Sequence, residues 1–200
     1  MSRNAALVLR APVKTNLLRI RLMKRITLLS AAILVMLGSV ALAENGPSFR
    51  ISAGPTMLFD PSTQESGIGG HVTLGYQVAP AWEIELYGAS SDHFDMKNDL
   101  TSGDASISLV TLGGRYLSSF SGKTRGFIAF GAGVMEIEAE DSPAGDDDTR
   151  SGGIGRFGVG IDHAFIPNLG VTMGAGFNRG FGDTDEVVLY DLTFSIFCAF

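Results

Sequence analysis

The chain has 200 residues, of which 45% are hydrophobic and 18% are charged, with 26 glycines and a formal net charge of −6. This length suits one ordinary domain, and the low charge content with roughly twice the usual share of glycine excludes both intrinsic disorder and a long helical bundle. Extended structure is therefore favoured.

The N-terminal segment predicts export. A basic stretch ends at Met23-Lys24-Arg25, the run from Ile26 to Leu42 carries no charge, and Ala41-Leu42-Ala43 supplies the small residues that signal peptidase requires. We expect residues 1–43 to form a signal peptide that is cleaved after Ala43. No cysteine follows the apolar run, so a lipoprotein signal is excluded.

Two alternatives for this segment stay open. Because Met23 alone could begin a compact signal, residues 1–22 are either a mis-assigned start or an unusually long basic region. The apolar run could also remain as an uncleaved membrane anchor, since a run of this length can just span a bilayer.

Residues 44–200 carry eight basic and 21 acidic side chains, a net charge of −13. Such a body repels nucleic acid, so we expect no nucleic-acid partner. The single cysteine, Cys198, has no partner within the chain, so the fold must rely on packing and hydrogen bonds rather than on a disulfide.

Segments of about ten residues in this body alternate between apolar and polar side chains, and clusters of Gly, Pro, Asn, Asp and Ser bound them, which is the signal of β-strands. No sustained helical period is present. The eight predicted strands are Ser48–Phe59, Gly69–Val78, Trp82–Ser90, Ser106–Leu117, Gly126–Ile137, Gly153–Phe165, Leu169–Arg179 and Val187–Phe200.

The predicted connections alternate between long and short, which indicates an up-and-down meander of four hairpins. Only the turn at Ser118–Arg125 is longer than this pattern requires. The long connections are Asp60–Ile68, Ser91–Ala105, Glu138–Gly152 and Gly180–Glu186, and the short ones are Ala79–Ala81 and Ile166–Asn168.

Most strands have one continuously apolar face, and alternation alone does not say whether it points inward. Two features favour an inverted barrel with the apolar face outside. Aromatic residues of that face lie near strand ends, where interfacial girdles belong. Ionisable residues lie in mid-strand on the polar face beside many glycines, as in a narrow lumen. We predict a lumen charge network of Arg50, Glu83, Glu85, Arg156, Asp162 and Asp191.

The fourth and fifth strands depart from this alternation. Ile107 and Leu109 change parity relative to Val110 and Leu112, and Phe127–Val134 is apolar on both faces. Either a β-bulge or apolar residues that fill the lumen would explain the departure.

These features together resemble the small eight-stranded outer-membrane barrels of Gram-negative bacteria, namely the OmpA transmembrane region, the OmpX/Ail group and OmpW. The resemblance rests on the signal segment, the eight alternating strands, the unequal connections and the aromatic final strand, and covers nearly all of residues 44–200. It implies an all-β fold, an eight-stranded antiparallel up-and-down transmembrane β-barrel with both termini in the periplasm.

The resemblance also implies partners. Outer-membrane lipid and lipopolysaccharide would surround the barrel, and the barrel assembly machinery would recognise the final strand. The residues expected to form this assembly signal are Tyr190, Phe194, Ile196 and Phe200.

No catalytic, cofactor or metal site is predicted. His71 lies on a polar strand face, His93 in an acidic loop and His163 near a turn, and no nucleophile and base can be paired from the sequence. The His-x-Ser motif of barrel deacylases is absent, although a triad of distant residues remains an alternative. The acidic loops do not match a calcium-loop spacing, so we expect solvated charge there rather than a metal site.

Arg179 lies between two aromatic residues in Phe177-Asn178-Arg179-Gly180-Phe181, at the predicted outer rim. It could pair with a phosphate of lipopolysaccharide, or it could extend along the surface as an interfacial anchor.

The function that these features favour is a non-enzymatic outer-membrane barrel that displays acidic extracellular loops for envelope integrity, surface interaction or adhesion. A narrow channel or a small-solute transport barrel is the main alternative. A lipid A-modifying enzyme and a soluble periplasmic barrel that binds a lipophilic ligand are further alternatives.

Overall fold

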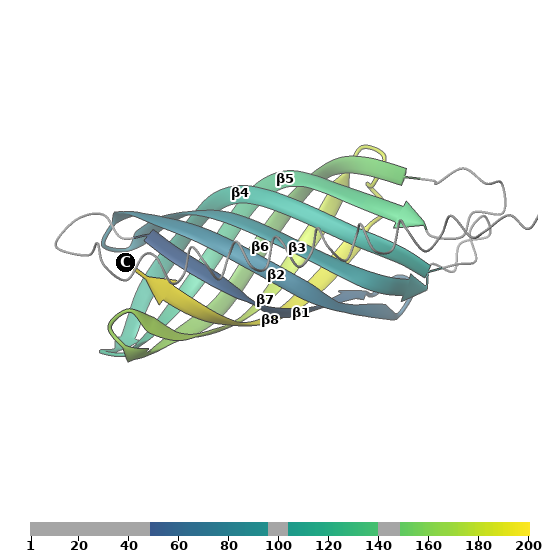
Figure 1. Ribbon diagram of the computed structural model, residues 1–200. Helices are drawn as coiled ribbons and strands as arrows, with labels where there is room; N and C mark the ends of the chain where they lie inside the picture. The colour runs from purple at the N-terminus through teal and green to yellow at the C-terminus, as the bar shows by residue number, and fades with distance from the viewer. Residues whose placement is uncertain (1–48, 96–103, 140–148) are drawn as a thin grey trace, which may run out of the picture. The chain divides into compact units, whose positions relative to one another are not determined.

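The computed structural model describes residues 49–95, 104–139 and 149–200, which belong to one compact unit, Leu42–Phe200. Their strands form a closed antiparallel barrel in chain order, so the predicted eight-stranded up-and-down barrel is confirmed (Figure 1). The strands are β1 (Phe49–Asp60), β2 (Glu65–Ala79), β3 (Trp82–Asp95), β4 (Asp104–Ser121), β5 (Thr124–Ala139), β6 (Thr149–Ile166), β7 (Leu169–Phe181) and β8 (Val188–Ala199). None of the described residues forms a helix long and apolar enough to cross a membrane.

The two ends of the barrel differ. The turn end carries the short connections and the C terminus, and the loop end carries the connections that follow β1, β3, β5 and β7 (Figure 1). The expected signal peptide, residues 1–43, lies outside the described residues.

The strand register gives the barrel a large stagger. One row of paired outward-facing residues passes once around the barrel and returns to β1 at Phe59, ten residues beyond its start at Phe49. The row is mostly aromatic: Phe49, Tyr76, Ile84, Gly114, Phe130, Phe157, Phe177, Tyr190 and Phe59. Such a stagger tilts the strands by roughly 35–45° from the barrel axis.

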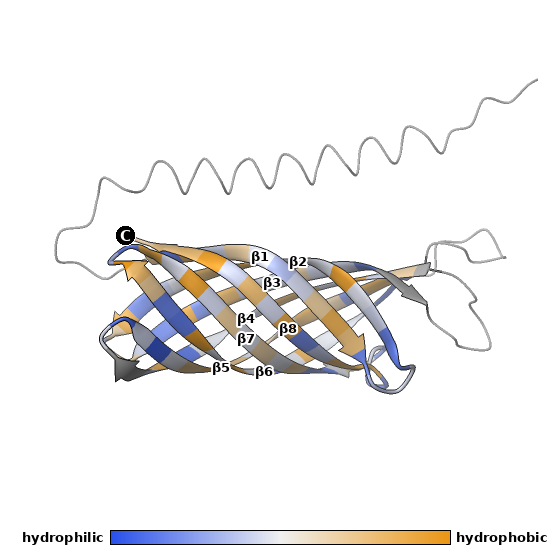
Figure 2. Ribbon diagram, turned by 90° about the horizontal axis from the view of Figure 1, so that it is seen from below, coloured by the Kyte–Doolittle hydropathy of each residue, from blue (hydrophilic) through white to orange (hydrophobic). Residues whose placement is uncertain are grey.

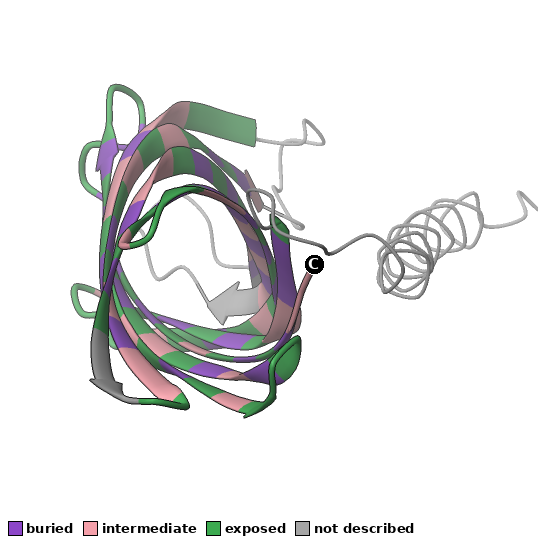
Figure 3. Ribbon diagram, turned by 90° about the vertical axis from the view of Figure 1, so that its left-hand side faces the viewer, coloured by how far each residue is buried: buried purple, intermediate pink, exposed green. Residues whose placement is uncertain are grey.

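The apolar face of the strands points outward. Leu74, Ile84 and Phe194 are 42%, 47% and 45% exposed, whereas Thr73, Glu83 and Ser195, next to them along the strands, are buried inside the barrel. Alternating bands of hydropathy and of burial run along the ribbons (Figures 2 and 3). The inverted arrangement expected from the sequence is confirmed, and it suits a closed barrel in hydrocarbon because closure leaves no unpaired strand edge.

Near the loop end, the polarity of the two strand faces is exchanged, so that the inward face becomes apolar. On β4, Val110 and Leu112 are exposed on the outer face, but nearer the loop end Ile107 and Leu109 are buried inside. The pairing of β4 with β5 is continuous through these residues, so no bulge changes their direction. Of the two explanations that the sequence left open, apolar residues that fill the lumen are the correct one.

Several connections are shorter than predicted. The turn predicted at Ser118–Arg125 was too long, because β4 continues to Ser121 and β5 begins at Thr124, which leaves Gly122 and Lys123 between the strands. A register irregularity between Ser119 and Ser121 accompanies this tight turn. The long connections are also shorter than predicted, because β2, β3, β4 and β6 extend further toward the loop end.

The seam between β1 and β8 closes the barrel. Phe49 and Phe200 exchange both backbone hydrogen bonds, at 2.8 and 2.9 Å, so every second residue from Phe49 directs its N–H toward β8. Pro55 falls on such a position and has no N–H to donate. The recorded pairing is interrupted there, between Ala53–Ile196 and Thr56–Thr193.

Candidate functional site

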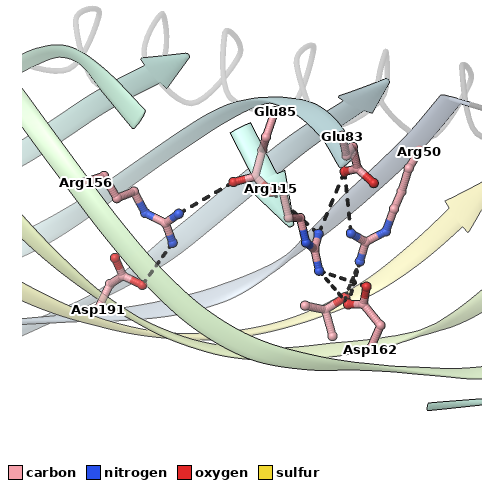
Figure 4. Close-up of polar contacts among 8 residues, drawn as sticks. Arg50, Glu83, Glu85, Arg115, Arg156, Asp162 and Asp191 are labelled. Carbon is pink, nitrogen blue, oxygen red and sulfur yellow. Dashed lines mark hydrogen bonds and ion pairs between the residues drawn. The ribbon is translucent and has the colours of Figure 1, made fainter. Parts of the chain in front are cut away.

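The turn end of the lumen is filled by a network that centres on Asp162 of β6. Nη2 of Arg115, from β4, lies 2.8 Å from both carboxylate oxygens of Asp162, and Nη2 of Arg50, from β1, lies 2.9 Å from Oδ1 (Figure 4). Thr172 of β7 donates its hydroxyl to the same oxygen at 2.8 Å and accepts from Arg50 at 2.5 Å. We call Arg50, Glu83, Arg115, Asp162 and Thr172 the turn-end network.

Two glutamates of β3 extend this network. Oε1 of Glu83 lies 3.8 Å from Nη1 of Arg50 and 3.9 Å from Nη1 of Arg115. Glu85 links the network to a third arginine, Arg156, because its two oxygens lie 3.5 Å from Nη1 of Arg115 and 3.6 Å from Nη1 of Arg156. The carboxylates of β3 thus join side chains of β1, β4 and β6 across the lumen.

Asp191 of β8 ends the chain of charges. Its Oδ1 lies 3.4 Å from Nη2 of Arg156, and its Oδ2 accepts a hydrogen bond of 2.7 Å from the side-chain amide of Asn178 (Figure 4). The order Asp191, Arg156, Glu85, Arg115, Asp162 forms one continuous series of opposite charges. These side chains are at most 8% exposed, and buried charges are tolerated only where opposite charges lie close to them.

Arg50, Arg115 and Arg156 each also lie over an aromatic ring. The guanidinium carbon is 4.6 Å from the ring centre of Phe197 for Arg50, 3.6 Å from that of Phe127 for Arg115, and 3.7 Å from that of Tyr87 for Arg156. Cation–π contact with a desolvated guanidinium contributes up to about 2 kcal/mol. Ring and carboxylate together hold each guanidinium across the lumen.

The loop end of the lumen is apolar instead. A cluster of buried side chains from six strands and one connection, which we call the loop-end core, lies there in contact with Tyr87. Its members are Leu58, Ala89, Ala105, Ile107, Leu109, Met135, Ile137, Ile154, Val187 and Leu189. The outer face at the same height is polar on β3 to β6, where the paired row Ser90, Ser108, Glu136 and Ser151 follows the last apolar residues.

The six residues of the predicted charge network all lie inside the barrel. They make no single cluster by themselves, because Arg115, which the sequence analysis did not name, connects Glu85 with Glu83 and Asp162. The signal that could have found Arg115 was its parity: it lies an odd number of residues from Val110 and Leu112, which belong to the outward apolar face.

The other singled-out residues lie on the outer face. Tyr190, Phe194 and Ile196 are exposed along β8, and Phe200 pairs with Phe49 next to it. Arg179 is exposed on β7.

The histidines do not form a catalytic set within the described residues. His71 is buried in the lumen and stacks on Tyr87, whereas Nδ1 of His163 lies 2.9 Å from the hydroxyl oxygen of Thr124 on the exposed surface. No acidic side chain among the described residues completes this pair into a triad. The side chain of His93, residues 96–103 and the acidic stretch at 140–148 lie outside the described residues. Within the described part of the chain, no group of three His, Cys, Asp or Glu side chains is placed to hold a metal ion.

Comparison with known proteins agrees with this architecture. Residues 28–196 match the family model described as outer membrane protein beta-barrel domain. No curated protein sequence matches the chain.

Three solved barrels illustrate the structural similarity. Neisserial surface protein A aligns with a TM-score of 0.62 and 12% identity, over 78% of this chain and 98% of its own. Ail of Yersinia pestis, in complex with the heparin analogue sucrose octasulfate, gives 0.57 and 17%, over 78% of this chain and 100% of its own. OprG of Pseudomonas aeruginosa gives 0.55 and 14%, over 79% and 98%. At these identities the similarity extends to the fold alone.

Proposed function

Because the chain belongs to the outer membrane protein β-barrel family, we propose that it is a closed, non-enzymatic barrel that holds acidic loops rigidly at the cell surface. One observation carries the proposal: at the turn end of the lumen, ion pairs join side chains that come from different strands (Figure 4). An eight-stranded barrel has room for little beyond its own side chains. A wide diffusion pore is therefore the function that this interior supports least.

The loop-end core supports the scaffold role in a second way. On β4 and β5 the strands become polar outside and apolar inside, as in a water-soluble barrel, at residues such as Ser108 and Glu136. The barrel would therefore protrude from the membrane with a dry interior directly beneath the loops. A packed core of this kind holds the bases of the loops in fixed positions.

The proposed orientation places the loop end outside the cell and both termini in the periplasm. Charge supports this orientation, because the segments 60–65, 91–105, 136–152 and 179–187 contain sixteen acidic and three basic residues. The corresponding test is chemical labelling of a cysteine introduced at Gly145 in intact cells. A cysteine introduced at Gly122, at the turn end, is the matched control and should react only after the outer membrane is permeabilised.

The negative charge of the loops indicates which kind of partner they would bind in surface interaction, adhesion or envelope integrity. The Ail structure holds a heparin analogue, which is a polyanion. The acidic loops of this chain would repel such a ligand and attract a cationic one. Binding of intact cells to surfaces coated with polylysine or with heparin tests this: preference for heparin would contradict the proposed surface.

The export and assembly signals are part of the same proposal. Cleavage after Ala43 would leave a mature chain that begins at Glu44, which N-terminal sequencing of the mature protein tests. The exposed outer face of β8, with Tyr190, Phe194, Ile196 and Phe200, would be the surface that the barrel assembly machinery recognises before β8 pairs with β1.

The decisive experiment for the closed lumen is single-channel recording in planar bilayers. We expect no stable conductance steps from the purified full chain. Large, stable steps would favour the channel alternative. Loss of acyl chains from lipid A in cells that make the protein would favour the enzyme, and release by sodium carbonate would favour a soluble barrel.

A further inference from the structure

We propose that Arg179 binds the phosphate group of a glycolipid in the outer leaflet, at a single site on the β6–β8 side of the barrel. The proposal rests on the proposed orientation, which places the loop end in the outer leaflet. Beyond the scaffold function, it specifies the class of lipid that the barrel binds and the side of the barrel that binds it.

Arg179 points away from the lumen. Its neighbours along β7, Asn178 and Gly180, are buried inside the barrel, and Arg179 itself is exposed. It pairs with Gly155 of β6 and Val188 of β8, so its guanidinium lies on the outer surface. Only one further outward residue, Phe181, follows before β7 ends.

The guanidinium of Arg179 has no ion-pair partner in the part of the chain that the structure describes. Among residues 49–95, 104–139 and 149–200, no carboxylate lies within ion-pair distance of Arg179. Arg150, the other described loop-end arginine, has Glu186 at 3.2 Å. A charge at the edge of hydrocarbon is stabilised by an anionic partner, and a lipid phosphate at this height would supply one.

The surroundings place Arg179 at the height of lipid head groups. Exposed aromatic rings flank it: Phe177 and Phe181 lie two residues away on β7, and Tyr190 of β8 lies 5.6 Å from Phe177 between ring centres. Aromatic side chains of this kind mark the boundary between hydrocarbon and head groups. Guanidinium and phosphate form paired, charge-assisted hydrogen bonds at such a boundary.

The opposite side of the rim lacks this chemistry. At the corresponding boundary β3 to β6 present the row Ser90, Ser108, Glu136 and Ser151, which carries a carboxylate and no described cation. Glu136 would repel a phosphate there, and this row has no guanidinium that could donate hydrogen bonds to it. We therefore expect one tightly bound phosphorylated glycolipid per barrel rather than a ring of them.

The test uses the full chain purified in detergent and native mass spectrometry with four probes. These are diphosphoryl lipid A, its dephosphorylated form, phosphatidylglycerol and inorganic phosphate. The variants are Arg179→Gln, Arg179→Lys and the matched control Arg150→Gln, each checked for heat-modifiable mobility so that only folded barrels are compared.

We expect one equivalent of diphosphoryl lipid A on the unsubstituted chain. Arg179→Gln should weaken this binding about tenfold or more, Arg179→Lys should restore part of it, and Arg150→Gln should leave it unchanged. The dephosphorylated lipid should bind as weakly to the unsubstituted chain as lipid A binds to Arg179→Gln.

Three results would overturn the proposal. They are equal binding by Arg179→Gln, an equal loss in Arg150→Gln, and a preference for inorganic phosphate or phosphatidylglycerol over lipid A. Failure of the proposed orientation is read separately, from the labelling of loop cysteines in intact cells. If the loops are labelled in intact cells but Arg179→Gln binds lipid A as well as the unsubstituted chain does, the lipid site alone is refuted.

Discussion

Arg115 and Asp162 join β4 to β6 through the interior of the barrel, with one guanidinium nitrogen 2.8 Å from both carboxylate oxygens. The two side chains are 2% and 4% exposed. β5 alone separates their strands in the barrel wall, so the pair fixes the curvature of that wall from inside.

Replacing Asp162 with Asn should therefore destabilise the barrel strongly. The substitution removes the charge that Arg50 and Arg115 share and leaves two buried guanidinium groups without their main partner. Breaking a buried pair in this way costs about 3–5 kcal/mol. Urea unfolding in detergent micelles, followed by tryptophan fluorescence, measures the change.

The control for this prediction is Arg150→Gln, which breaks a pair whose side chains are 44% and 61% exposed. An exposed pair contributes about 0–1 kcal/mol. Equal unfolding midpoints for Asp162→Asn and Arg150→Gln would contradict the structural role of the turn-end network.

The two leucines Leu109 and Leu112 of β4 offer a matched comparison of inside and outside. Leu109 is 1% exposed in the loop-end core, and Leu112 is 61% exposed on the outer face. Leu109→Ala should lower the free energy of unfolding by about 2–4 kcal/mol, because it leaves a cavity among packed side chains. Leu112→Ala should lower it by less, because lipid or detergent fills the space. A larger effect at Leu112 would mean that the loop-end core is not packed.

Gly113 should tolerate no side chain. A Cβ at this inward position would collide with the carbonyl oxygen of Phe130 and the Cα of Gly131, both in the backbone of β5. The backbone of β5 cannot rotate out of the way, so Gly113→Ala should cost about 3 kcal/mol or prevent folding. Gly122→Ala is the control, since no atom lies within 4 Å of a Cβ there. The measurement is the fraction of heat-modifiable barrel after refolding, and equal fractions would refute the close approach.

Pro55→Val should strengthen the β1–β8 seam. Valine supplies the N–H that Pro55 lacks on the side facing β8, where one ladder hydrogen bond is missing. A hydrogen bond gained in a lipid environment should raise the free energy of unfolding by about 1 kcal/mol. Ala53→Val, on the same outer face but already paired with Ile196, should change little. If hydrogen exchange of the seam amides is no slower in Pro55→Val than in the unsubstituted chain, the prediction fails.

Phe200→Ala should impair assembly in cells more than stability in detergent. The substitution removes a ring stacked 6.1 Å from Phe49 but leaves the backbone hydrogen bonds between the two residues intact. If the assembly machinery reads the outer face of β8, protease-resistant barrel should fall severalfold in cells while refolding in detergent stays near normal. If the yield of folded barrel falls equally in cells and in detergent, Phe200 has a structural role only.

Much of this architecture follows from period-two alternation, because each strand meets two environments that differ in polarity. The eight strands, their order and the outward apolar face could be predicted for this reason. What alternation cannot convey is where along a strand the outside changes from hydrocarbon to water. At Ile107 and Leu109 the inward face becomes apolar beside Val110 and Leu112, and the sequence alone allowed a bulge as an equal explanation.

Most residues of the charge network could be predicted from the sequence, but the contacts between them could not. Arg50, Glu83, Glu85, Arg156, Asp162 and Asp191 follow from parity and charge, yet which of them meet depends on the stagger of the barrel. Arg115 was missed because it belongs to the strand whose alternation is broken. The turn at Gly122 and Lys123 was predicted too long because β4 stays polar through its last residues, which resemble a loop in sequence.

The dry interior beneath the loops has a practical consequence for protein engineering. A foreign peptide inserted between Ala139 and Thr149 would be attached to strands whose inward residues, Ile137 and Ile154, are already buried on the protein side. The barrel beneath the inserted peptide would therefore stay folded whatever the sequence of the peptide. The barrel is thus suited to serve as a carrier for antigen display on bacterial cells or vesicles.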